Sequence, residues 1–200
     1  MYQVIGKLSN RAFRVVWMLE ELDQPYELLV TNPHEETATA HNPSGKVPVL
    51  LVDGEPITDS AAILQFLADR HKRFTFPAGS LERARQDSLI HMINDEMDAL
   101  LWTGTKHMFL LPEDQRMPDI RRPLKWEFGK SVDHLAAALG DKDYLMGDEI
   151  TVPDILAAHC LNWAFGAKYP VENEKVVAYG KRMRARPAFR KLNDAAKGAG

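Results

Sequence analysis

The first third of the chain alternates between two patterns of apolar and polar residues. Short apolar runs rich in branched and aromatic residues predict strands at Tyr2–Ile5 and Tyr26–Val30. Between them, Asn10–Leu22 carries apolar residues at helical spacing, with Glu20 and Glu21 on the polar face. A strand, a helix and a strand with short connections form a βαβ unit, so the two strands are expected to run parallel.

A second group of elements is expected between residues 34 and 71. A short helix is predicted at His34–Ala40, and the apolar run Val47–Val52 predicts a strand. Asp53-Gly54 is a strong signal for a tight turn into an antiparallel partner strand. A helix is then expected at Ser60–His71. The order βαβ, α, ββα is the pattern of a thioredoxin-like α/β domain.

Helical patterns dominate after the turn or linker signal Phe76-Pro77-Ala78-Gly79-Ser80. Amphipathic segments predict helices at Glu82–Phe109, Pro118–Leu139, Val152–Ala167, Glu172–Arg184 and Pro187–Ala196. Gly140 is expected to end the second of these helices, and Thr151-Val152-Pro153-Asp154 matches a capping box that opens the third. The sequence therefore predicts an α/β domain at residues 1–76, a linker at 77–82 and an all-helical domain at 83–200.

The composition excludes several classes of protein. The net charge of −3 gives no reason to expect nucleic acid or an anionic membrane surface as a partner. No apolar run approaches the roughly 18 residues of a membrane-spanning helix. The single cysteine, Cys160, rules out an internal disulfide and a cysteine-rich metal site, and the scattered histidines predict no metal. With polar residues too frequent near the N-terminus for a signal peptide, a cytoplasmic protein is predicted.

The segment Asn42–Ile63 carries the most specific functional pattern. A proline near the head of a strand cannot donate to the sheet, so Pro48 is expected at an edge or in a specialised turn. Asp59 and Ser60 open a helix, where backbone N–H groups and side-chain oxygens provide an anion site. Together these features can clamp a small anionic peptide. The segment resembles the glutathione-binding half of the cytosolic glutathione transferases, and the whole chain resembles a bacterial member of serine type.

Two roles are possible for Ser9. From the residues alone, it is an N-cap candidate for the first helix. In the family, the residue that contacts the glutathione sulfur lies five positions before an arginine-led apolar run, which Arg14–Glu21 matches here. The resemblance therefore implies that the Ser9 hydroxyl donates to the thiolate, aided by the positive end of the helix. Asn10 stands where many members have proline, so it either assists or replaces Ser9.

The resemblance also implies how the rest of glutathione is held. The Val47–Pro48 bond is expected to be cis, with the backbone of Val47 pairing with the cysteinyl part. Asp59 and Ser60 would receive the γ-glutamyl group, although both residues are also ordinary helix openers.

Lys46 and His34 are further candidates. Each would face the glycine carboxylate of glutathione, the alternative being a side chain that is simply solvated beside a turn.

The function implied is that of a glutathione transferase with glutathione as co-substrate and no metal. The thiolate would attack a small hydrophobic electrophile, and the protein would form a homodimer. Two alternatives stay open: another glutathione-dependent reaction, such as disulfide or peroxide reduction, dehalogenation or isomerisation, and a non-catalytic interaction or stress protein of the same fold.

Overall fold

A computed structural model describes residues 1–198, which form two compact units. The first unit joins Met1–Pro77 to the C-terminal segment that starts at Arg184, and the second is Ala78–Met183. The domain limits expected from the sequence, 1–76 and 83–200, remain a prediction. By its contacts the last helix, α9 (Pro187–Gly198), packs with the first unit.

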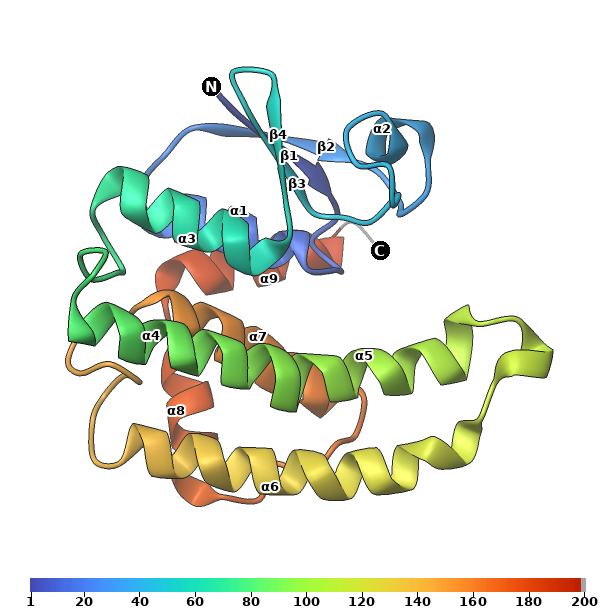
Figure 1. Cartoon of the computed structure of the whole chain (residues 1–200), viewed down its shortest axis with the longest axis vertical. Coiled ribbons are helices and arrows are strands. Elements are labelled where there is room, and N and C mark those ends of the chain that lie inside the picture. Colours follow the sequence, from blue (N-terminus) through green and yellow to red (C-terminus); the bar gives the residue numbers. More distant parts are fainter. Residues whose placement is uncertain (199–200) are drawn as a thin grey trace. The chain divides into compact units, whose positions relative to one another are not determined.

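In the part of the chain that the structure describes, the first unit contains a four-stranded sheet with the strand order β2-β1-β3-β4. Its strands are β1 (Tyr2–Gly6), β2 (Tyr26–Val30), β3 (Val49–Val52) and β4 (Glu55–Thr58). Its helices before α9 are α1 (Ala12–Glu21), α2 (Glu36–Thr39) and α3 (Ser60–His71). β1 and β2 are parallel, whereas β3 is antiparallel to both β1 and β4. This confirms the thioredoxin-like α/β organisation, in which α1 and α3 pack together (Figure 1).

The turn between β3 and β4 follows the predicted chemistry. Asp53 and Gly54 both have positive φ, 53° and 92°, which suits the tight turn expected from this dipeptide. A strand was predicted at Val47–Val52, whereas β3 begins two residues later, at Val49. Pro48 therefore lies before an interior strand, not within an edge strand, and it removes no donor from the ladder.

The helix α9 is anchored on α1 by both apolar and charged contacts. The ring of Phe189 packs edge-on against Phe13 and Trp17, with centroid distances of 5.2 and 5.0 Å. Arg186 forms a two-pronged ion pair with Glu21, at 2.6 and 2.7 Å. Such bidentate pairs are geometrically specific as well as strong, so they fix where α9 lies along α1.

The second unit is helical, and this confirms the predicted all-α character of that part of the chain. Its main helices are α4 (Leu81–Met92), α5 (Ala99–Thr105), α6 (Arg121–Leu139), α7 (Val152–Gly166) and α8 (Glu174–Arg184). Short 3₁₀ turns, η3 (Glu113–Gln115) and η4 (Pro118–Ile120), precede α6. Gly140 ends α6 with a φ of 58°, as expected for a glycine after a helix.

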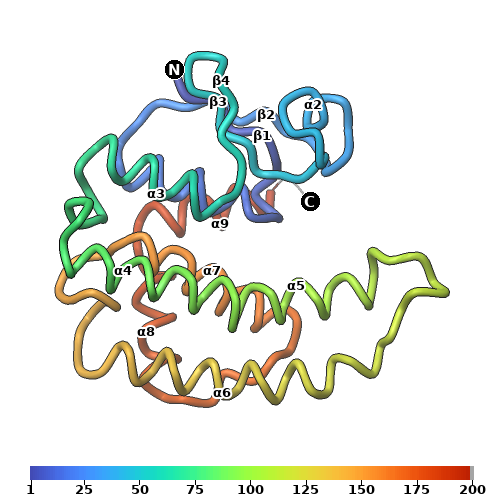
Figure 2. The backbone as a smooth tube through the Cα atoms, in the orientation of Figure 1, coloured from blue at the N-terminus to red at the C-terminus, as the bar shows by residue number. Residues whose placement is uncertain are grey.

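The long helix expected at Glu82–Phe109 contains two π-helical segments, η1 (Ile93–Asp98) and η2 (Lys106–Leu110). Figure 2 shows this interrupted rod running alongside α6. Ser131 on α6 donates to the backbone oxygen of Glu96 at 2.7 Å. A π-helical segment redirects backbone carbonyls from their usual partners, and the Ser131 hydroxyl gives one of them a partner.

The predicted capping box is present at the start of α7. The Asp154 carboxylate accepts from the backbone N–H and the hydroxyl of Thr151, both at 2.8 Å. It also accepts from the backbone N–H of Leu145 at 2.9 Å and from the hydroxyl of Tyr179 at 2.8 Å. Burial raises the pKa of Asp154, and these donors offset part of that rise. One carboxylate thus ties the start of α7 to α8 and to the loop before it.

Within residues 1–198, no helix is both long and apolar enough to cross a membrane. The same part of the chain contains no cluster of three His, Cys, Asp or Glu side chains with metal-binding geometry.

Candidate functional site

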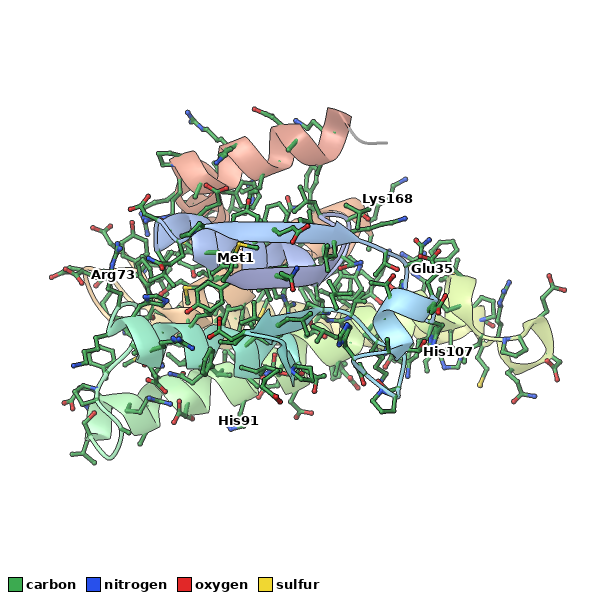
Figure 3. The ribbon with its side chains drawn as sticks, turned by 90° about the horizontal axis from the view of Figure 1, so that it is seen from above. Met1, Glu35, Arg73, His91, His107 and Lys168 are labelled. Carbon is green, nitrogen blue, oxygen red and sulfur yellow. The ribbon has the colours of Figure 1, made fainter. Side chains whose placement is uncertain are left out.

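The sheet topology brings four loops to one end of the first unit. Gly6 pairs with Val30 at the ends of the parallel strands β1 and β2. β3 runs the opposite way, so its first residue, Val49, pairs with Ile5 and with Thr58, the last residue of β4. Met1, before β1, and Glu35, in the loop after β2, lie toward different ends of the strands (Figure 3). All the site residues predicted from the sequence lie in or beside these loops.

Ser9 and Asn10 lie in the turn between β1 and α1. Ser9 is exposed, and α1 begins at Ala12, so Ser9 is not the N-cap. The side-chain oxygen of Asn10 instead accepts from the backbone N–H of Ala12 at 2.9 Å. The capping alternative for Ser9 is therefore wrong, because Asn10 takes the local hydrogen bond that a capping serine would make.

Gly6 allows the start of α1 to pack close against the end of β1. Its φ is 143°, and a Cβ placed there would lie 2.7 Å from the Cβ of Ala12 and 3.4 Å from the Cβ of Val47. The first distance is shorter than real carbon contacts allow. A glycine is therefore needed for the start of α1 to lie this close to the end of β1, whereas the Val47 contact would be an ordinary one.

Replacing Gly6 by alanine is expected to lower the free energy of unfolding by about 2–4 kcal/mol, from overpacking and an unfavourable φ together. Chemical denaturation of the variant measures this loss. Gly54→Ala is the matched control, because Gly54 also has a positive φ, 92°, but a Cβ there meets no atom within 4 Å. Equal losses in the two variants would contradict the proposed close approach.

The Val47–Pro48 peptide bond is cis, as the resemblance implied. Val47 is half-buried and Lys46 is exposed. The side-chain nitrogen of Asn42 donates to the backbone oxygen of Lys46 at 2.9 Å, which braces the approach to Pro48.

His34 is exposed and has a φ of 67°, which explains why α2 begins at Glu36 and not at the predicted position. Its backbone N–H donates to the oxygen of Gly45 at 2.8 Å. Its ring lies against Gly45, because a Cβ at that glycine would collide with the His34 Nδ1 atom. His34 is therefore held against Gly45, the residue before Lys46.

Asp59 and Ser60 open α3 directly after β4. Asp59 has a φ of 70°, and its carboxylate accepts from the N–H groups of Ala61 and Ala62 at 2.9 and 3.1 Å. Ser60 is buried, and its hydroxyl accepts from the Nη1 of the buried Arg14 at 3.1 Å. Asp59 is thus the cap expected of a helix opener. The Arg14–Ser60 bond fixes the start of α3 against α1.

A network centred on Glu35 was not predicted from the sequence. The Lys7 ammonium donates to the side-chain oxygen of Asn32 at 2.6 Å. The Glu35 carboxylate accepts from the backbone and side-chain N–H groups of Asn32 and from the hydroxyl of Thr31. These hydrogen bonds, most of all those from Asn32, lower the pKa of Glu35 to about 2, so the carboxylate is ionised near neutral pH. The only hint in the sequence is an Asn and a Glu three residues apart.

The assembled site combines features that suit a small peptide with anionic groups. It contains the half-buried Val47 before the cis proline, a helix start at Asp59 and Ser60, and the exposed cationic side chain of Lys46. These groups come from separate loops at one end of a thioredoxin-like sheet, the arrangement of a glutathione-binding domain.

Comparison with known proteins agrees with this class. Residues 8–70 match the family model of the glutathione S-transferase N-terminal domain, and residues 106–187 match that of the C-terminal domain. The glutathione S-transferase GstA of Escherichia coli O157:H7 is 31% identical over 154 residues, which cover 74% of this chain and 72% of the relative. The chain belongs to the glutathione S-transferase family and is a glutathione-dependent transferase enzyme.

Solved structures show the same fold. A glutathione S-transferase from Xylella fastidiosa superimposes with a TM-score of 0.86 at 20% identity, covering 98% of this chain and 99% of that one. One from Methylobacterium radiotolerans, solved in complex with glutathione sulfonate, gives a TM-score of 0.76 at 25% identity. That alignment covers 96% of this chain and 93% of the other.

Proposed function

We propose that the loops at this end of the sheet bind glutathione and convert its thiol to a thiolate for attack on a small hydrophobic electrophile. The observation that carries the proposal is the convergence of the β1–α1 turn, the cis Val47–Pro48 approach and the Asp59–Ser60 helix start at one sheet end. The M. radiotolerans relative, whose structure contains glutathione sulfonate, supports the choice of ligand.

Ser9 is the proposed catalytic residue. A free thiol has a pKa of about 8.5, and a hydroxyl donor together with a helix N-terminus stabilises its anion. A shift of about two units would leave most of the bound thiol ionised at neutral pH. The sulfur then forms a bond to an electrophilic carbon, and a leaving group such as halide departs with the electron pair. Asn10 assists at most through its amide N–H, since its oxygen already accepts from Ala12.

The remaining parts of glutathione are assigned to the other loops. The backbone of Val47, just before Pro48, would pair with the cysteinyl unit as an added strand. Asp59 would face the γ-glutamyl ammonium, and Ser60 with the helix N-terminus would face its carboxylate.

Lys46 and His34 would face the glycine carboxylate. His34 lies in the β2–α2 loop and Lys46 in the α2–β3 loop, and the bond from the His34 N–H to the oxygen of Gly45, the residue before Lys46, supports this assignment.

We further propose that the protein acts as a cytoplasmic homodimer without a metal cofactor. The competing reactions on the same site are disulfide or peroxide reduction, dehalogenation and isomerisation.

The proposal is tested by titrating glutathione into the protein in a calorimeter and by following its conjugation to an aryl halide. Binding at millimolar concentration or below, with formation of the thioether, is expected. Binding without thioether formation, but with turnover of a disulfide or peroxide, would favour a competing reaction. If neither heat nor thioether formation is detected at millimolar glutathione, these loops do not bind glutathione and the proposed site assignment is wrong.

A further inference from the structure

We infer that Glu35 is a positioning residue that holds three loops of the glutathione site together through Asn32, Lys7 and the backbone of His34. The inference rests on the proposed function, because it assigns a role to a residue beside that site.

The first link joins the β1–α1 turn to the loop after β2. Lys7 follows β1 directly and lies two residues before Ser9, and its ammonium donates to the side-chain oxygen of Asn32 at 2.6 Å. The side chain of Asn32 in turn donates to Glu35. Asn32 is thus fixed at both ends of its amide, and it connects a charged donor to a charged acceptor. Hydrogen bonds with ionised partners are the stronger kind.

The second link closes the loop after β2 on itself. The Glu35 carboxylate accepts from the backbone N–H of Asn32 and the hydroxyl of Thr31, both at 2.8 Å. With the side-chain bond from Asn32, one carboxylate therefore organises Thr31–Glu35 from within. His34 lies inside this closed turn, and its φ of 67° is unfavourable for a residue with a side chain. The ring of hydrogen bonds around it stabilises that conformation.

The third link passes from His34 to the approach to Pro48. The His34 N–H donates to the Gly45 oxygen at 2.8 Å, and the imidazole lies against the same glycine. Gly45 directly precedes Lys46 and Val47. Loss of the Glu35 carboxylate is therefore expected to loosen the positions of His34 and Lys46 as well as the Ser9 turn.

The charge of Glu35 makes the expected direction of the change in glutathione affinity diagnostic. Glutathione is a net anion at neutral pH, so an acidic side chain near its site disfavours binding by repulsion alone. Removing such a charge without any positioning effect would tighten binding. A positioning role predicts weaker binding in spite of the lost repulsion.

The test compares Glu35→Gln with Glu36→Gln, because Glu36 is the exposed neighbour and loses the same charge. Glu35→Gln is expected to weaken glutathione binding and raise its KM by about five- to tenfold, with a smaller change in kcat. Glu36→Gln is expected to bind as the unchanged protein does, or slightly more tightly. Equal or tighter binding by Glu35→Gln would overturn the inference.

A second pair of variants, Asn32→Ala and its combination with Glu35→Gln, tests the link through Asn32, and thermal unfolding of each variant checks that it is folded. If the two residues act as one unit, Asn32→Ala weakens glutathione binding as Glu35→Gln does. The double variant then binds glutathione with about the same affinity as the weaker-binding of the two single variants. Losses that multiply in the double variant would contradict the linkage. Failure of the unchanged protein to bind glutathione would instead remove the proposed function, so the two failures are distinguishable.

Discussion

Asp154→Ala is expected to lower the free energy of unfolding by about 4 kcal/mol, a large fraction of the roughly 5–15 kcal/mol of an ordinary folded protein. The carboxylate accepts four hydrogen bonds from Leu145, Thr151 and Tyr179, and its residue is completely buried. Alanine leaves those donors without their acceptor in the interior, where each unsatisfied group costs about 1–3 kcal/mol. Thermal and urea unfolding of the purified variant measure the loss.

Two further variants make this prediction specific. Asp148→Ala removes an exposed carboxylate from the same loop and is expected to change the stability by less than about 0.5 kcal/mol. Asp154→Asn keeps one acceptor oxygen and is expected to fall between the other two. A loss below about 1 kcal/mol for Asp154→Ala would show that the hydrogen bonds around this carboxylate contribute little.

Ser9→Ala is expected to reduce kcat/KM for conjugation by about 10²-fold, the usual cost of removing one donor to a developing or stabilised anion. The reduction should lie mostly in kcat, because the other contacts proposed for glutathione do not involve this hydroxyl. Ser9 is exposed and makes no capping bond to α1, so the variant is expected to keep its stability. Steady-state kinetics below pH 7, where the free thiol is protonated, measure the effect most sensitively.

Asn10→Ala separates the two candidates in the turn. It removes the acceptor for the Ala12 N–H, at 2.9 Å, and is expected to cost about 1 kcal/mol of stability while retaining most of kcat. A greater loss of kcat in Asn10→Ala than in Ser9→Ala would transfer the catalytic role to Asn10.

Local signals in the sequence were sufficient for most of the fold. Asp53-Gly54 fixed the hairpin because few residues other than glycine, asparagine and aspartate adopt the backbone of such a turn. The Thr151–Asp154 box and Gly140 marked helix ends by chemistry that acts over three or four residues. These features depend on neighbours along the chain, so no knowledge of tertiary contacts was needed.

Features that depend on distant partners were not predicted. The π-helical segment Ile93–Asp98 is accompanied by a hydrogen bond from Ser131, which comes 35 positions after its partner Glu96. The amphipathic pattern of α9 predicted a helix, but nothing in that pattern named α1 as its partner. The choice of α1 as the packing partner depends on the contacts of Phe189 with Phe13 and Trp17.

The same distinction, between local signals and contacts among distant residues, applies to the candidate site. Spacing and resemblance pointed to Ser9, Lys46 and Asp59, and the sheet topology brings their loops to one end. The network around Glu35 escaped prediction because it needs Lys7 and Asn32, 25 positions apart, to meet across two strands. The hydrogen bond from the Ala12 N–H to Asn10 was missed because serine and asparagine side chains make such local bonds equally well, and only the geometry selects between them.

The ultraviolet absorbance of the thiolate of bound glutathione, followed as a function of pH, tests the central claim most directly. The pKa of the bound thiol is expected about two units below its usual 8.5, and Ser9→Ala should abolish most of that shift. A bound thiol with an ordinary pKa, or a lowered pKa that Ser9→Ala leaves unchanged, would contradict the assignment of Ser9 as the group that stabilises the thiolate.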